Sequence, residues 1–141
     1  MKRIVAMTSA ALLAVLVACG GGGTGTKASN TPSTTTRPAS TGKVTILSPT
    51  PNQVIHGTVL HVKLQLTGAT LVPTASAHIT PDTGHIHVSI DGKIKSLLAG
   101  LNYDATGLTA GLHLLTIEFV AADHGPFNPR VIVRQTFTVV K

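Results

Sequence analysis

Acidic and aromatic residues are both scarce in this chain. It has five Asp and Glu against 11 Lys and Arg, and residues 43–141 hold all five acids but only seven of the basic residues, a net charge of +2. Such a small, unclustered excess provides no electrostatic basis for nucleic-acid binding. With three Phe, one Tyr and no Trp, the chain also lacks the side chains of a stacking platform for bases or sugars.

Cysteine occurs once, at the end of a leader. Residues 1–18 begin with basic residues, continue in an apolar run and end in small residues, which is typical of a secretory signal peptide; the run is too short for a permanent membrane helix. Residues 16–19, Leu-Val-Ala-Cys, resemble the lipobox of bacterial lipoprotein precursors. The resemblance implies cleavage before Cys19, lipid on its thiol and an extracytoplasmic protein anchored to the membrane. An ordinary leader with a chance cysteine is the alternative.

Residues 19–42 lack the apolar side chains of a packed core. Four glycines follow Cys19, and the stretch up to Gly42 is mostly Gly, Ser, Thr and Pro. This composition cannot bury enough apolar surface to offset its ordering entropy, so it predicts a flexible linker. A phosphate-binding glycine loop is excluded because no strand precedes the glycines and no Lys-Ser/Thr pair follows at the required spacing.

Residues 43–141 predict a single all-β domain, because no ten-residue window has a convincing helical period. Pro49 and Pro51 end the first strand, since neither can donate to a ladder. Asp91-Gly92 predicts a type I′ hairpin turn. Residues 68–84, with Pro73 and Pro81, are irregular and predict a loop or an excursion at the edge of a sheet. The predicted strands cover residues 44–49, 60–68, 85–91, 93–98, 111–120 and 130–140.

About seven short strands at intervals near ten residues predict an immunoglobulin-like antiparallel β-sandwich. A small closed barrel is the alternative. A true antibody domain is excluded, because the buried cysteine pair and tryptophan of that class are absent.

Seven histidines provide the main candidates for chemistry. His85 and His87 are two residues apart on a predicted strand, about 6.6 Å between Cα atoms, and point to the same outward face. Two such imidazoles can bind one Zn(II) or Cu(II) ion, but a site of this kind needs a third and usually a fourth ligand. Two polar side chains on the wet face of a sheet are the alternative.

Two further histidines could complete such a site. His124 lies in a loop stiffened by Pro126 and Pro129, which can hold a ligand or serve only as a tight connection. His113 shares its strand parity with inward residues, and a core-edge histidine bonded to a backbone carbonyl is the more common outcome for such a position. His61 is predicted to be solvated.

The histidine motifs together resemble an uncharacterised family of bacterial envelope proteins with immunoglobulin-like domains. GHIHVSIDG, GLHLL and DHGPFNPRV are similar to its GHxH strand, GxH strand start and HxP loop, within residues 58–141. The resemblance implies that four histidines recur as a group, and implies no activity. Some relatives have a third histidine where this chain has Ile86, so no ligand role carries over there. The matching residues are Gly84, His85, His87, Asp91, Gly111, His113, Asp123, His124, Pro126 and Pro129.

Copper-zinc superoxide dismutases also combine an HxH strand with a similar loop. Here His124 precedes Gly125-Pro126, the stabilising cysteine pair is absent and the domain is much shorter, so no enzyme is implied. The chain also has no GxSxG or HExxH motif and no carboxylate pair placed for acid-base work.

Two function classes therefore stand, both non-enzymatic. In the first, His85, His87, His124 and His113 form a metal-binding module for copper or zinc outside the membrane. In the second, the domain is a structural or interaction module that meets an envelope protein or the cell wall, and the rings form hydrogen bonds to backbone, Asp91 or Asp123 instead of converging.

Overall fold

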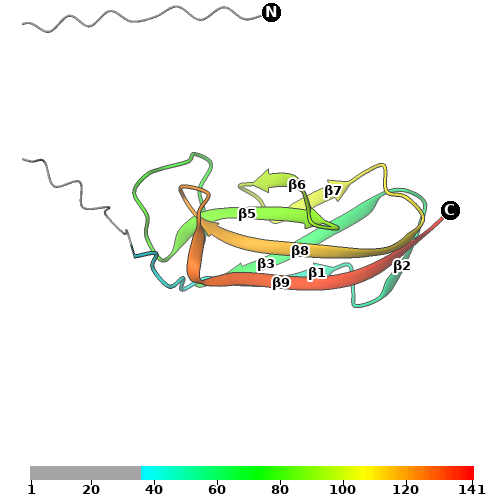
Figure 1. The fold of residues 1–141 in the computed structure, drawn as a ribbon, viewed down its shortest axis with the longest axis horizontal. Helices are drawn as coiled ribbons and strands as arrows, with labels where there is room; N and C mark the ends of the chain where they lie inside the picture. The colour runs from blue at the N-terminus through cyan, green and yellow to red at the C-terminus, as the bar shows by residue number, and fades with distance from the viewer. Residues whose placement is uncertain (1–35) are drawn as a thin grey trace, which may run out of the picture. The chain divides into compact units, whose positions relative to one another are not determined.

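The computed structural model describes residues 36–141, which form nine β-strands and no helix (Figure 1). One sheet has the order β1-β3-β7, and the other has the order β2-β9-β8-β5-β4, with β6 also paired to β5. In this part of the chain, no helix is long and apolar enough to cross a membrane. The strands are β1 (Lys43–Ser48), β2 (Gln53–His56), β3 (Leu60–Thr67), β4 (Thr70–Leu71), β5 (Thr83–Ile90), β6 (Lys93–Leu98), β7 (Asn102–Ala105), β8 (Gly111–Ala121) and β9 (Pro126–Val140).

The strand order identifies the architecture. Strands β1, β3 and β7 form one layer and β6, β5, β8 and β9 the other, which is the arrangement of immunoglobulin-like sandwiches. Figure 1 shows β5, β8 and β9 in front of β1 and β3. The predicted immunoglobulin-like fold is confirmed.

Three short strands, β2, β4 and β7, lie outside the predicted strand ranges. β7 pairs antiparallel with β3, whereas β2 and β4 pair in parallel, β2 with β9 and β4 with β5. The prolines account for β2. The ladder between β1 and β3 ends at Ser48, because Pro49 and Pro51 have no N–H to donate. The chain then turns at Asn52, whose φ is 59°, and continues beside β9. The other strand pairs are antiparallel, as predicted.

The inward faces of the two sheets form the core. Leu60, Val62 and Leu64 of β3 are each at most 3% exposed, which confirms the alternation expected there. On β5, Ile86, Val88 and Ile90 face inward in the same way. Asp91 and Gly92 have φ values of 52° and 76°, as a type I′ turn requires, so the predicted hairpin between β5 and β6 is also present.

Residues 36–42, here named the strap, pack against the domain although their composition predicts a linker up to residue 42. Arg37 donates two hydrogen bonds to the carboxylate of Asp123, at 2.6 and 2.8 Å. The backbone N–H of Thr41 donates to the carbonyl of Pro81 at 3.0 Å. These polar contacts replace the apolar burial that the strap lacks, so the folded part of the chain begins before residue 43.

Three predicted features lie outside the described residues. They are the signal peptide of residues 1–18, the lipidated Cys19, and the linker as far as residue 35.

Candidate histidine site

Strand β5 presents His85 and His87 on the outer face of the six-stranded sheet, because Ile86 and Val88 point into the core. Gly84 allows β5 to approach β8 closely at this end: a Cβ there would lie 1.9 Å from the carbonyl oxygen of Val120. The shared face of the two histidines is as predicted from strand geometry.

His85 is nevertheless buried, with 4% of its surface exposed, whereas the sequence suggests a wet position. The β8–β9 turn covers it, since Ala122 lies within 3.3 Å of its Nε2 and the ring of His124 stacks on it. The loop after β4 adds to this cover, because the N–H of Ser76 donates to the carbonyl of Ala122. The alternation along a strand predicts on which face of the sheet a side chain lies. Whether that side chain is exposed depends on which other segments cover the face.

The turn between β8 and β9 positions His124. Its backbone N–H donates to the carbonyl of Ala121 at 2.9 Å, and its φ is 63°. Histidine is among the few residues that tolerate this left-handed region. Asp123 stabilises the turn by accepting a hydrogen bond from the N–H of Gly125 at 3.0 Å and by its ion pair with Arg37. The Arg37 guanidinium holds the pKa of Asp123 at about 2, so the carboxylate stays charged.

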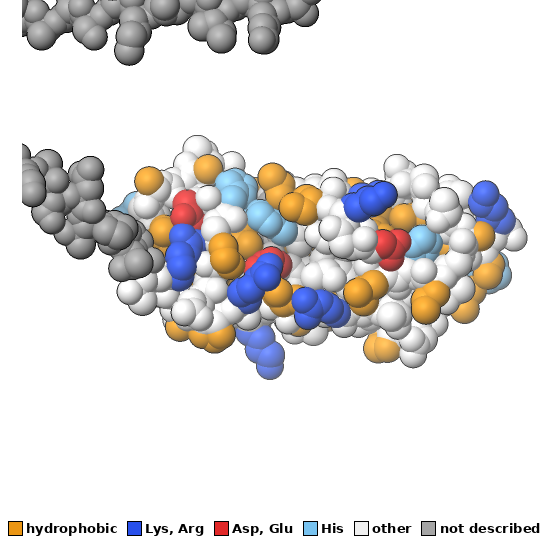
Figure 2. Space-filling model, in the orientation of Figure 1, with side chains coloured by type: hydrophobic (Ala, Val, Ile, Leu, Met, Phe, Trp, Pro, Cys, Tyr) orange, Lys and Arg blue, Asp and Glu red, His pale blue; other side chains and the backbone are white. Residues whose placement is uncertain are grey.

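The three rings lie against one another. The centroids of His85 and His124 are 4.2 Å apart, with 7° between the ring planes. His87 Nε2 lies 3.2 Å from His124 Nδ1, so one of these nitrogens donates a hydrogen bond to the other. Figure 2 shows histidine side chains gathered side by side on this face. His85, His87 and His124 are here named the histidine cluster.

Burial favours the neutral form of two of these rings. It lowers the pKa of His85 and of His87, and the neighbouring His124 lowers both further. The carboxylate of Glu118, which is opposite His87 on β8, acts in the other direction and offsets part of the lowering of the pKa of His87. This carboxylate is engaged by Arg130, at 2.6 and 2.8 Å.

The cluster is not a complete metal site as it stands. Among residues 36–141, no set of three or more His, Cys, Asp or Glu side chains is arranged to hold a metal ion. His87 and His124 direct nitrogens toward each other, but the Nε2 of His85 faces the carbonyl of Ala122. The geometry therefore offers two convergent nitrogens, with His85 packed behind them.

His113 lies at the opposite end of β8 and is not part of the cluster, contrary to its inclusion among the candidate ligands. Its Nδ1 is 2.7 Å from Asp91 Oδ2, and its Nε2 is 2.9 Å from the carbonyl oxygen of Thr109. Both partners are acceptors, so the ring donates to both only when it carries two protons. These hydrogen bonds raise the pKa of His113. The backbone carbonyl contact is the outcome expected for a core-edge histidine.

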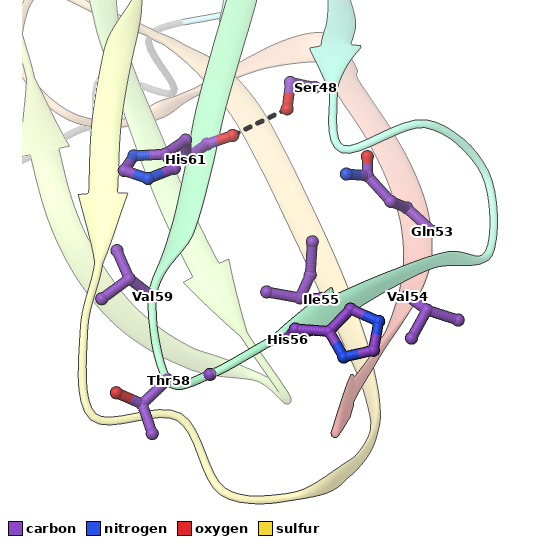
Figure 3. A pocket seen from close by; sticks show the side chains of 9 residues that line it. Ser48, Gln53, Val54, Ile55, His56, Thr58, Val59 and His61 are labelled. Atoms are coloured by element: carbon purple, nitrogen blue, oxygen red, sulfur yellow. Dashed lines mark hydrogen bonds between the residues drawn. The ribbon is translucent and has the colours of Figure 1, made fainter. Parts of the chain in front are cut away.

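The remaining histidines do not converge. His61 is exposed and pairs with Asp104 at 2.7 Å. His56 and His61 line an open recess of about 450 Å³ beside β2. Figure 3 shows their rings turned to opposite sides of it, with Ser48 bonded to the backbone of His61 and not to its ring. This recess has no convergent set of polar side chains.

Sequence reasoning missed the contribution of Arg37. It is a lone basic residue in a stretch of linker composition, 86 residues from Asp123. The only available signal was the presence of an arginine beside Pro38, which by itself predicts nothing.

Of the comparisons with known proteins, only that with solved structures finds similar chains, and the similarity is one of fold. No protein-family model matches the chain, and no curated protein matches it. Fibronectin(III)-like modules of CbhA from Clostridium thermocellum are 15% identical, over 68% of this chain and 94% of that one, with a TM-score of 0.46. An engineered protein is 13% identical over 71% of this chain but only 20% of its own length, with a TM-score of 0.44.

Proposed function

We propose that this chain is a lipid-anchored, extracytoplasmic protein of the bacterial envelope whose immunoglobulin-like domain is a non-enzymatic binding module for Zn(II) or Cu(II). His87 and His124 are the proposed ligands. The observation that carries the proposal is the 3.2 Å separation of His87 Nε2 and His124 Nδ1.

That separation suits a shared ion. Zinc binds imidazole nitrogen at about 2.0–2.1 Å, so two nitrogens on one tetrahedral ion lie about 3.3 Å apart. An ion can thus replace the proton between the rings without changing this separation, while each ring turns so that its nitrogen lone pair points at the ion. All-imidazole ligation suits Zn(II) and Cu(II), with copper the tighter binder on intrinsic affinity. Water or a group from a partner would complete the coordination.

The surroundings of the two rings support pre-organisation. His124 is held at a left-handed φ by a turn that Arg37 and Asp123 stabilise, and its other face is packed on His85. Groups positioned before the ligand arrives lose less entropy on binding. The role of His85 in this proposal is to support His124 and not to supply a third nitrogen.

The metal proposal is tested by titrating Zn(II), and separately Cu(II), into the purified full chain while following the histidine ring signals by NMR. One equivalent should shift the rings of His87 and His124 together, and His124→Asn, which tolerates the left-handed φ of this position, should abolish the effect. His56→Ala is the matched control, because His56 is exposed on β2. Unchanged signals for His87 and His124 at saturating metal, with the domain folded, would contradict the proposal.

The anchoring proposal rests on the lipobox-like residues before Cys19 and is independent of the metal. Expressed in bacteria, the full chain should fractionate with membranes and carry acyl groups on Cys19, detectable by mass spectrometry of the N-terminal peptide. Cys19→Ser should release it to the soluble fraction. Membrane association unchanged by Cys19→Ser would show that another feature retains the protein.

A further inference from the structure

Exposed apolar side chains gather on one face of the domain. Six large hydrophobic residues of the described chain are exposed, and five of them belong to the six-stranded sheet. Strand register places all five on its outer face, together with His87 and Glu118. Leu97 and Ile94 pair with the outward His87 and Ser89 of β5, and Val54, Leu112 and Leu114 alternate with inward residues of their own strands. The five residues are Val54 on β2, Ile94 and Leu97 on β6, and Leu112 and Leu114 on β8. They are here named the apolar face.

Five of the six exposed large hydrophobic residues of the described chain thus lie on one side of one sheet. Single exposed hydrophobic residues need no explanation, but a contiguous group rimmed by polar residues marks an interaction site. A groove of about 380 Å³ crosses this face, and Ile94, Leu114 and Arg134 are among its lining residues. Figure 2 shows apolar and basic side chains interspersed there.

The charge on the face is positive. Arg130 and Arg134 of β9 project beside the apolar residues, and the one acid, Glu118, is paired with Arg130. Among the described residues, Arg134 has no carboxylate within ion-pair distance. An arginine next to exposed leucines is typical of interface composition, and its best partner is a carboxylate that it can bind in a bidentate manner.

The chain itself is poorly suited to supply that partner. Of its five acids, four are already paired in the described structure, with His113, His61, Arg130 and Arg37. In a second copy, Asp82 is therefore the one acid of the described residues that would not have to give up a present pair to bind Arg134. Residues 20–35 contain no large apolar side chain and no acid, so the linker cannot match the face either.

We propose that the outer face of the six-stranded sheet is a docking surface for a different protein, one that presents an apolar strip bordered by carboxylates. The five apolar residues provide the buried centre, and Arg134 forms an ion pair with the partner at its edge. This docking goes beyond metal binding and does not depend on it; it rests on the proposed location in the envelope, which fractionation with Cys19→Ser tests separately.

Site-specific photo-cross-linking of the full chain in the bacterial envelope tests the proposal. A benzophenone amino acid is placed at Leu112 or Ile94, which are 71% and 63% exposed, and at Leu47 as the matched control, 46% exposed on the other sheet. Both positions on the apolar face should give the same protein adduct, and Leu47 should not. The acceptor site, mapped by mass spectrometry, should be next to Asp or Glu.

Charge variants then decide whether the adduct reports this interface. Arg134→Glu should reduce its yield about tenfold, and Arg134→Lys much less, because charge reversal opposes a carboxylate. Changing the mapped acid of the partner to Arg should restore the yield with Arg134→Glu. The proposal is overturned if no adduct forms, or if adducts form only with lipid or only with a second copy of the chain. It is also overturned if Leu47 gives the same adduct in equal yield. Thermal unfolding of each variant verifies that it is folded.

Discussion

The two ends of the β5–β8 strand pair carry histidines in opposite chemical situations. At one end, His113 has an acceptor at each ring nitrogen, and its pKa is raised. At the other, the rings of the histidine cluster face one another, and in the described structure none of them has a carboxylate as hydrogen-bond partner. A histidine whose nitrogens are both bonded serves the fold, whereas His87 and His124, whose ring nitrogens bond to each other, can bind a ligand from outside.

The largest expected effect is at the satisfied end. Asp91→Ala removes the acceptor of His113 and that of the Leu114 N–H, and places Ala at a positive φ. The buried ring of His113 left without an acceptor, together with the strained φ of Ala, should lower the free energy of unfolding by about 2–4 kcal/mol, measured by urea denaturation. Asp104→Ala breaks the exposed pair with His61 and should change stability little. Equal effects of the two substitutions would mean that burial does not distinguish the pairs.

The pH dependence of stability sharpens the same contrast. The folded pKa of His113 is raised above 6.5, so its contribution is fully present below pH 6.5 and is lost as the pH rises through the folded value. The stability difference between the wild type and His113→Gln should therefore be larger at about pH 5.5 than at about pH 9. Urea denaturation at the two pH values measures it. A constant difference would indicate that the ring is neutral in the folded protein.

A smaller effect is expected at the strap. Arg37→Ala removes a bidentate pair with Asp123 whose side chains are 24% and 30% exposed, and should cost about 1 kcal/mol. The pKa of Asp123 is lowered from 3.8 to about 2, so this contribution is present above pH 3.8 and is lost as the pH falls toward 2. The measurement compares the free energies of unfolding of Arg37→Ala and Arg134→Ala, because Arg134 forms no ion pair among the described residues. If the two variants are equally stable, the strap is not held by this pair.

The smallest change in stability is expected in the histidine cluster. Asn, like His, tolerates the left-handed φ of residue 124, so His124→Asn should alter the free energy of unfolding by about 0.5 kcal/mol, while it removes the proposed ligand. His124→Val, with a β-branched side chain, should cost about 1–3 kcal/mol more. If His124→Asn destabilises the domain as much as Asp91→Ala, both ends of the strand pair serve the fold and the comparison fails.

Local patterns predicted the parts of the molecule that depend on local geometry. The alternation in β3 and β5, the hairpin at Asp91-Gly92 and the proline break after Ser48 all follow from constraints on neighbouring residues. The short strands β2, β4 and β7 did not follow, because short strands carry little pattern of their own and form where a partner strand lies beside them. The burial of His85 was missed for the same reason, since the β8–β9 turn covers it.

The sequence alone determined the β-sandwich and the shared face of His85 and His87, because a strand's period of two is a property of the backbone. Only the tertiary structure decided which histidines meet. His87 and His124 are 37 residues apart in sequence, and Arg37 is 86 residues from Asp123. Separations of that size leave no local pattern, since they arise from the packing of whole strands and turns. The same packing separated His113 from the cluster and paired it with Asp91.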